Sequence, residues 1–332
     1  MINRKGKVYI LCSGYFKTGG LESLHLLCHT LRKKNIDAYM VYTVEEQQIG
    51  NQRWRVGHPG HGNVDVCPQW MDYISDNAKN EAYNIYDTIA TKVIEDDPKN
   101  TLIVPEIYLN ALNNFNNITK AVWWLASRIL PDGSYKHDEW FNFNINREVY
   151  HLYNSKFAEH MLFSLNASRY FQLKTFVNEN IISTNIDKED IICYNPKKGI
   201  EFTNKIIKEL PDYKFIPIKG MMPNEVTDAL SKAKVYIDFG NHPGRERIPR
   251  EAALCNCCVL LGFQGSAMFF EDTPILEKYK FEVTDDSIPN IINMIKNIIS
   301  DYNAYSKDFN LYRNILKNNK LQFNIDVENL LV

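Results

Sequence analysis

Short apolar runs alternate with amphipathic stretches along most of the chain. This alternation is typical of βαβ units and predicts mostly parallel sheets. The apolar runs of the first half predict strands at Val8–Ser13, Ala38–Tyr42, Thr101–Pro105, Lys120–Leu125 and near His151–Ser155. Apolar residues at helical spacing predict helices at Gly20–Lys34 and around Glu81–Ile94.

The same rhythm restarts at residue 191. The predicted strands are Ile191–Tyr194, Lys214–Ile218, Val235–Phe239 and Cys257–Leu261, and the predicted helices are Glu201–Leu210, Asn224–Lys232 and Pro249–Cys255. Between residues 175 and 190 the chain is polar and lacks a helical stripe, which indicates a domain boundary. A length of 332 residues also fits two domains of roughly 100–200 residues each.

We therefore expect an α/β protein with two Rossmann-like domains that face a cleft. The N-terminal domain is placed at residues 1–180 and the C-terminal domain at residues 181–305. From Ile288 to the C-terminus apolar residues recur at helical spacing. Residues 306–332 are predicted to form a helical segment that returns to the N-terminal domain.

Composition and charge exclude several function classes. Hydrophobic residues make up 45% of the chain and charged residues 23%, which is ordinary for a folded globular protein. With 38 Lys and Arg against 40 Asp and Glu, the chain lacks the basic excess of nucleic-acid-binding proteins. No run approaches the roughly 20 apolar residues that span a bilayer. We interpret the apolar start at residues 8–16 as the first strand and not as a signal peptide.

The cysteines point to a reducing compartment. Their number is odd, and they are scattered and mostly lie in apolar runs, at Cys12, Cys28, Cys67, Cys193, Cys255, Cys257 and Cys258. This pattern is expected of reduced thiols, so we predict a cytoplasmic protein. The cluster at residues 255–258 could bind a metal ion, but it lacks the paired spacing of zinc sites, which favours buried packing.

A pair of glycines follows the first predicted strand. Gly19 and Gly20 directly precede the first helix, where backbone can approach a ligand closely and free N–H groups attract an anion. The surrounding residues match neither the P-loop pattern nor the dinucleotide-binding pattern, which argues against nucleotide hydrolysis and redox chemistry. The alternative is a tight turn without a ligand.

Cationic residues cluster in two turns of the second half. Lys197 and Lys198 follow a strand at the sheet edge where open α/β sheets bind ligands, and Lys219 and Gly220 follow the next strand. A solvated charge pair is the alternative for the two lysines. A second cluster surrounds the start of a helix and consists of Gly244, Arg245, Glu246, Arg247, Arg250 and Glu251. Cations at a helix N-terminus oppose the helix dipole, so this cluster suits binding of a polyanion such as a diphosphate.

These motifs, with the turn "KGMMPNEV" and the helix "PREAALCNCCVL", resemble the GT-B glycosyltransferases of the glycogen-synthase and mannosyltransferase type (family 4). The resemblance is strongest over residues 191–275. It implies that Glu251 holds the ribose of a nucleotide sugar, that Lys198 holds its diphosphate, and that Gly19 and Gly20 face the transferred sugar. The segment "HPGRERIPREAA" looks most like short bacterial enzymes of surface-polysaccharide synthesis.

The sequence departs from the family pattern at two places. The glutamate that usually stands eight residues before Glu251 is replaced by Pro243, so Arg245 or Glu246 would make that contact. The arginine that usually precedes the Lys-Gly turn is also missing, and Lys197 or a later arginine would supply its charge.

The predicted reaction is transfer of a sugar from a UDP- or GDP-linked donor to a glycan or lipid-linked acceptor. No Asp-x-Asp motif occurs, so fixed cations such as Lys198 and Arg247 would stabilise the leaving diphosphate without a metal ion or other cofactor. The resemblance favours retention of the anomeric configuration, and a lipid-linked acceptor would bring the protein to the inner membrane face. The alternatives are a sugar-nucleotide epimerase or hydrolase, or a catalytically silent binding protein.

Residues for the acceptor come from the N-terminal half. Glu106 follows a strand and could act as base or bind a sugar hydroxyl, or it could cap the next helix. His58 and His61 lie in a glycine-rich loop that is either part of the site or plain surface. Trp123 and Trp124 could stack on a sugar, although neighbours in a strand face opposite sides and at least one should be buried.

Overall fold

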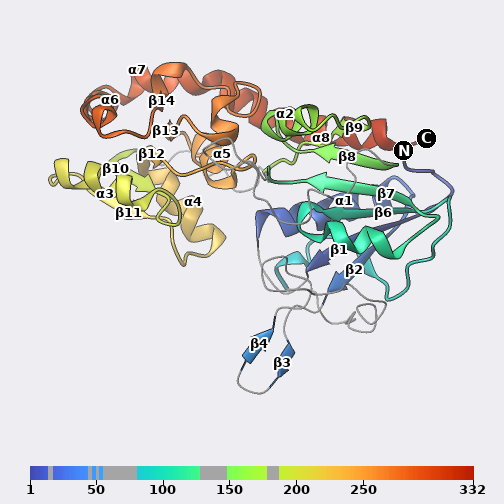
Figure 1. The fold of residues 1–332 in the computed structure, drawn as a ribbon. Helices are drawn as coiled ribbons and strands as arrows, with labels where there is room; N and C mark the ends of the chain where they lie inside the picture. The colour runs from blue at the N-terminus through green and yellow to red at the C-terminus, as the bar shows by residue number, and fades with distance from the viewer. Residues whose placement is uncertain (14–17, 44–46, 50–51, 55–80, 128–147, 178–186) are drawn as a thin grey trace.

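The computed structural model describes residues 1–13, 18–43, 47–49, 52–54, 81–127, 148–177 and 187–332. Within these residues the chain forms two parallel α/β domains that lie side by side (Figure 1). The predicted fold class is confirmed. The predicted boundary at residue 180 falls in the stretch 178–186, which is outside the described residues.

The first sheet has seven parallel strands in the order β5-β2-β1-β6-β7-β8-β9. Their bounds are β1 Lys7–Ser13, β2 Asp37–Thr43, β5 Ile89–Ala90, β6 Thr101–Pro105, β7 Thr119–Trp124, β8 Val149–Tyr153 and β9 Tyr170–Gln172. Strands β3 (Gln47–Ile49) and β4 (Gln52–Trp54) form a separate antiparallel hairpin. Helices α1 (Gly19–Lys33) and α2 (Lys156–Ser164) belong to this domain.

Alternate residues of β1 enter two different cores. Val8, Ile10 and Cys12 pack with α1, whereas Tyr9 and Leu11 pack on the opposite face with α2 and the helical turns at Glu106–Asn114. Because both faces are covered, the strands read as continuous apolar runs. The same arrangement buries Trp123 and Trp124 on opposite faces, so neither tryptophan is available to stack on a sugar.

The second sheet has five parallel strands in the order β11-β10-β12-β13-β14. Their bounds are β10 Glu189–Tyr194, β11 Lys214–Pro217, β12 Ala233–Asp238, β13 Cys258–Gly262 and β14 Lys280–Phe281. The helices of this half are α3 Ile200–Glu209, α4 Pro223–Lys232, α5 Arg247–Leu254, α6 Ile288–Ser300 and α7 Tyr302–Ser306. All strands and helices predicted for this half are therefore present, displaced by one or two residues at their ends.

The last helix, α8 (Asn310–Leu330), joins the two domains. It contacts α5 of the second domain and α1 of the first, and Figure 1 shows it running back to the N-terminus. Phe323, Val327 and Leu330 lie in the same core as Val8 and Ile10. The predicted return of the C-terminal helix to the N-terminal domain is confirmed. None of the helices in the described residues is long and apolar enough to cross a bilayer.

The helix predicted around Glu81–Ile94 is wrong. The structure has a single 3-10 turn at Glu81–Tyr83 and then the edge strand β5. This stretch contains β-branched residues at Ile85, Thr88, Ile89, Thr91 and Val93, which favour extended backbone at a sheet edge. Tertiary pairing with β2 outweighs the helical spacing of its apolar residues.

Candidate active site

The N-terminus of α1 lies at the carboxyl edge of the first sheet. The side chain of Thr18 caps α1 by accepting a hydrogen bond from Leu21 N at 3.2 Å. A methyl group on Gly19 would lie 3.8 Å from Cδ of Arg247, and one on Gly20 would lie 3.5 Å from Cδ1 of Leu125. The predicted glycine pair therefore faces both Arg247 of the other domain and the turn after β7.

The loop before α5 is the second wall of the site, and it touches the first domain. A methyl group on Gly244 would come within 2.3 Å of the carbonyl oxygen of Leu125. Ser127 N donates a hydrogen bond to Pro243 O in the same contact, and Ser266 Oγ donates to Gly244 O at 2.6 Å. A residue without a side chain is needed here because the backbones of the two domains meet.

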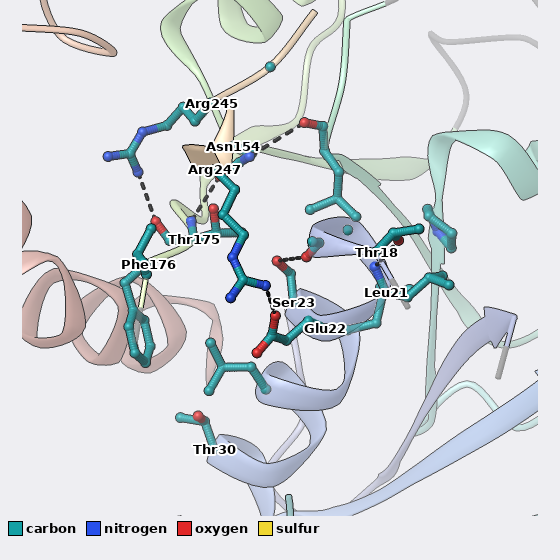
Figure 2. A pocket seen from close by; sticks show the side chains of 18 of the residues that line it. Thr18, Leu21, Glu22, Ser23, Thr30, Asn154, Thr175, Phe176, Arg245 and Arg247 are labelled. Carbon is teal, nitrogen blue, oxygen red and sulfur yellow. Dashed lines mark hydrogen bonds and ion pairs between the residues drawn. The ribbon is translucent and has the colours of Figure 1, made fainter. Parts of the chain in front are cut away.

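A cavity of about 880 Å³ lies between these walls, within the usual range of small-molecule sites. Many of the predicted residues line it, namely Gly19, Gly20, Glu106, Gly244, Arg245, Glu246, Arg247 and Arg250. It is also lined by Glu22 and Tyr86 of the first domain and by Thr175 and Phe176 of the segment that leads to the second. Figure 2 shows Arg247 reaching across it toward Glu22 on α1.

Arg247 forms ion pairs on both sides of the cavity. Its Nη1 binds Glu22 Oε2, and its Nε binds Glu251 Oε1 one turn along α5. The Tyr86 hydroxyl donates to the other oxygen of Glu22 at 2.9 Å. Burial opposes the charge of the guanidinium, but the two carboxylates outweigh it and raise the pKa of Arg247. Arg247 is therefore a fixed cation that links the two domains.

Lys198 supplies a second cation at the carboxyl end of β10. Its Nζ lies 2.7 Å from Glu246 Oε1, and both side chains are partly exposed. A methyl group on Gly240 would lie 2.2 Å from Cβ of Lys198, so the glycine makes room for the lysine. Glu251 and Lys198 do not line the cavity themselves, but each contacts a residue that does.

Arg245 and Arg250 are buried and bind backbone. Both donate from Nη1 to the carbonyl oxygen of Thr175, at 2.9 and 3.1 Å, and Arg250 Nη2 donates to Arg245 O at 2.8 Å. Burial lowers the pKa of both groups, and the neighbouring Arg245 adds to the fall of the Arg250 pKa to about 9. These contacts fasten the loop before α5 to the segment that connects the domains. Their predicted binding to a donor stays a prediction.

Asp238 stabilises the start of the loop between β12 and α5. It ends β12 in a buried position and accepts hydrogen bonds from Asn195 Nδ2 at 2.9 Å and from Gly240 N at 3.1 Å. Burial alone would raise its pKa, but His242 and these donors outweigh burial and lower the pKa. The carboxyl ends of β10 and β12 are thereby held together beneath Lys198.

Glu106 lies on the first-domain wall of the cavity. Its side chain is buried, and Oε2 accepts a hydrogen bond from Leu125 N at 3.1 Å. Asn154 Nδ2 donates to Leu125 O at 3.4 Å, and Asn154 Oδ1 accepts from Thr175 N at 2.8 Å. Glu106 and Asn154 thus support the turn that touches Gly244, and the catalytic role of Glu106 stays a prediction.

Lys197, Lys219 and Gly220 are exposed and do not line the cavity. Gly220 has φ of +68°, which a turn there requires, and Glu225 then caps α4 by accepting from Met222 N at 2.6 Å. Donor binding by these three residues stays a prediction. His58 and His61 lie outside the described residues.

Sequence reasoning missed Glu22, Tyr86, Asn154 and Thr175. Glu22 stands in the first turn of α1, where an acidic residue is explained by the helix dipole alone. The other three are distant in sequence from both motif clusters. The position of Glu22, two residues after the glycine pair, could have singled it out, but only the tertiary contact with Arg247 reveals its role.

The clustered cysteines of the second domain pack in its core. Lys188 Nζ donates to the carbonyl oxygens of Ala233 and Cys255, at 2.7 and 2.6 Å. Burial raises the pKa of the Cys257 thiol to about 11 and that of the Cys258 thiol to about 12. Across the part of the chain that the structure describes, no three His, Cys, Asp or Glu side chains are grouped to hold a metal ion.

Comparison with known proteins identifies the fold. No protein-family model matches the chain, and no curated protein sequence matches it. Among solved structures, sucrose-phosphate synthase from Thermosynechococcus elongatus matches with a TM-score of 0.64 at 11% identity over 94% of each chain. TarM matches with a TM-score of 0.62 at 11% identity, over 96% of this chain and 99% of TarM. HepE from Anabaena, solved with UDP and glucose, matches with a TM-score of 0.61 at 11% identity, over 98% and 99%. The chain has the GT-B fold of these glycosyltransferases.

Proposed function

We propose that this protein is a glycosyltransferase that moves a sugar from a nucleoside-diphosphate sugar to a glycan or glycolipid acceptor. The observation that carries the proposal is the cavity between the domains, where the N-terminus of α1, at Gly19, faces Arg247 of the second domain. Structures with the same fold were solved with UDP, with UDP and glucose, and with UDP-glucose. We therefore take a UDP-linked sugar as the first donor to test.

The residues divide between the parts of such a donor. Glu251 would hold the ribose hydroxyls, since its carboxylate is buried and is paired with Arg247, which lines the cavity. Lys198 and Arg247 would bind the diphosphate, and Gly19 and Gly20 would leave space for the sugar. Glu106 would meet the acceptor from the first-domain wall.

Charge accumulates on the diphosphate as the sugar leaves. Fixed cations and a helix N-terminus stabilise such charge in the transition state. In this chain Lys198 and Arg247 supply the cations, so we propose transfer without a metal ion. By its resemblance to retaining enzymes we also propose retention of configuration, a cytoplasmic protein and a role in surface-polysaccharide synthesis.

A thermal-shift screen of nucleoside diphosphates and then of nucleotide sugars tests the donor site. A ligand at 100 times its Kd stabilises the folded state by about 2.7 kcal/mol, which raises Tm measurably. Glu251→Ala should weaken the binding of the best ligand about 10- to 100-fold, or about 1.4–2.7 kcal/mol. Asp190→Asn is the matched control, because it removes an exposed, ion-paired carboxylate at the N-terminal end of β10. Lys198 and the candidate site lie beyond the carboxyl end of that strand. Unchanged affinity in a folded Glu251→Ala protein would remove Glu251 from the site.

A further inference from the structure

Glu22 is the carboxylate that meets Arg247 from the opposite domain. It lies on α1 three residues after Gly19, lines the cavity, and contacts Arg247 Nη1 through Oε2. Its other oxygen accepts the hydroxyl of Tyr86 at 2.9 Å. Both side chains of the pair are partly buried, with 29% of Arg247 and 25% of Glu22 exposed. The pair is therefore held in place within the cavity and is not a loose surface contact.

Four cations of the predicted donor site already have partners within the chain. Lys198 is paired with Glu246, Arg247 with Glu22 and Glu251, and Arg245 and Arg250 with the carbonyl of Thr175. A diphosphate that approached Arg247 would therefore meet two carboxylates. Like charges at contact distance repel strongly in a partly buried site.

Glu22 is the partner of Arg247 that can leave. Glu251 is 6% exposed and lies on the same helix as Arg247, four residues further along. Glu22 belongs to the other domain, and its other oxygen accepts a hydrogen bond from the Tyr86 hydroxyl. A change of the Glu22 rotamer would open Arg247 and leave its ion pair with Glu251 in place.

We propose that Glu22 occupies the place of the donor diphosphate on Arg247 while the site is empty, and that the donor binds by displacing it. This inference rests on the proposed function, because it takes a diphosphate as the ligand of Arg247. Glu22 then determines donor affinity: its charge must be moved away from Arg247 at every binding event. Removal of that charge should strengthen donor binding, whereas loss of a residue that only orients Arg247 should weaken it.

The test is isothermal titration of UDP and, separately, of inorganic pyrophosphate into wild type and Glu22→Gln. Glutamine keeps the shape of the side chain and can still accept from Tyr86. We expect both ligands to bind about three- to tenfold more tightly to Glu22→Gln, or about 0.7–1.4 kcal/mol. With a UDP-sugar that turns over, KM should fall while kcat stays nearly constant. Unchanged or weaker binding by a folded Glu22→Gln protein would overturn the proposal.

Further variants separate this effect from a structural one. In an Arg247→Ala background, Glu22→Gln should no longer change affinity, because the two substitutions act on one contact. Glu22→Asp, which shortens the acid and withdraws it from Arg247, should also tighten binding, though less. Asp190→Asn should leave affinity as in wild type. If neither ligand nor any other nucleoside diphosphate binds wild type, the proposed function fails together with the inference. If they bind but Glu22→Gln does not tighten binding, only the role of Glu22 fails.

Discussion

Gly19→Ala should separate folding from donor binding, because Gly19 can accept a methyl group only while the site is empty. Gly19 begins α1, and the nearest atoms to a methyl group at this position would be Cδ and Cβ of Arg247, at 3.8 and 3.9 Å. These are ordinary van der Waals distances. Alanine is also favoured over glycine in helices by roughly 0.5–1 kcal/mol. We therefore expect the substitution to leave the free energy of unfolding unchanged or slightly raised.

Donor binding should suffer, for a steric reason. Gly19 and Arg247 both line the cavity, so a methyl group on Gly19 would take up space beside the guanidinium that donor atoms would otherwise occupy. A donor atom needs roughly 3.5 Å to a carbon atom, so it would be pushed away from the N-terminus of α1 and from Arg247. We expect a loss of at least about tenfold in donor affinity, or about 1.4 kcal/mol.

The assay pairs urea unfolding with titration of UDP and with the donor KM. Gly20→Ala is the graded comparison, since its methyl would face Leu125 Cδ1 at 3.5 Å and not Arg247. We expect it to cost less affinity than Gly19→Ala. Wild-type donor affinity in a folded Gly19→Ala protein would refute the placement of the donor beside Gly19 and Arg247.

Three further perturbations address the domain contact and the chemistry. Gly244→Ala should lower the free energy of unfolding in urea by about 1–3 kcal/mol and reduce activity, because its methyl group would lie 2.3 Å from Leu125 O. A variant as stable as wild type would show that the domains do not meet there. Asp272 accepts hydrogen bonds from the backbone N–H groups of Lys156 and Phe157 at 2.8 and 3.1 Å. These bonds lower the pKa of Asp272, but burial outweighs them and raises the pKa above 3.8. The stability of wild type relative to Asp272→Asn should therefore fall as pH rises from about 3.8 through the raised pKa and stay level above it; a rise would contradict this sign. Transfer activity should survive EDTA, and loss of more than about 90% that Mg²⁺ or Mn²⁺ restores would reveal a metal site.

Local patterns were enough to predict the second domain. There each strand and helix is marked in the sequence by turn residues at its ends, such as the glycine and proline residues between β12 and α5. The C-terminal helix was equally predictable, since its apolar spacing continues beyond the last strand. The error at Glu81–Ile94 has the opposite cause: its apolar spacing fits a helix, and only the neighbouring strand β2 decides in favour of an extended edge.

The candidate site was predictable only in part. The glycine pair could be found because two glycines before a helix allow a ligand to approach the backbone closely. The arginine cluster could be found because cations at a helix N-terminus oppose the helix dipole. What each arginine contacts depends on tertiary structure. Arg245 and Arg250 bind the carbonyl of Thr175, 70 or more residues away, whereas Arg247 reaches Glu22. No spacing in the sequence encodes those separations.

Transfer of labelled sugar is the most direct test of the central claim, that this cavity binds a nucleotide sugar and moves its sugar to an acceptor. The measurement follows both sugar incorporated into an acceptor and nucleoside diphosphate released, for UDP- and then GDP-linked donors, with and without acceptor. The account predicts release that depends on the acceptor and matches incorporation one to one. Release without incorporation, isomerised sugar formed without an acceptor, or tight donor binding without turnover would contradict it.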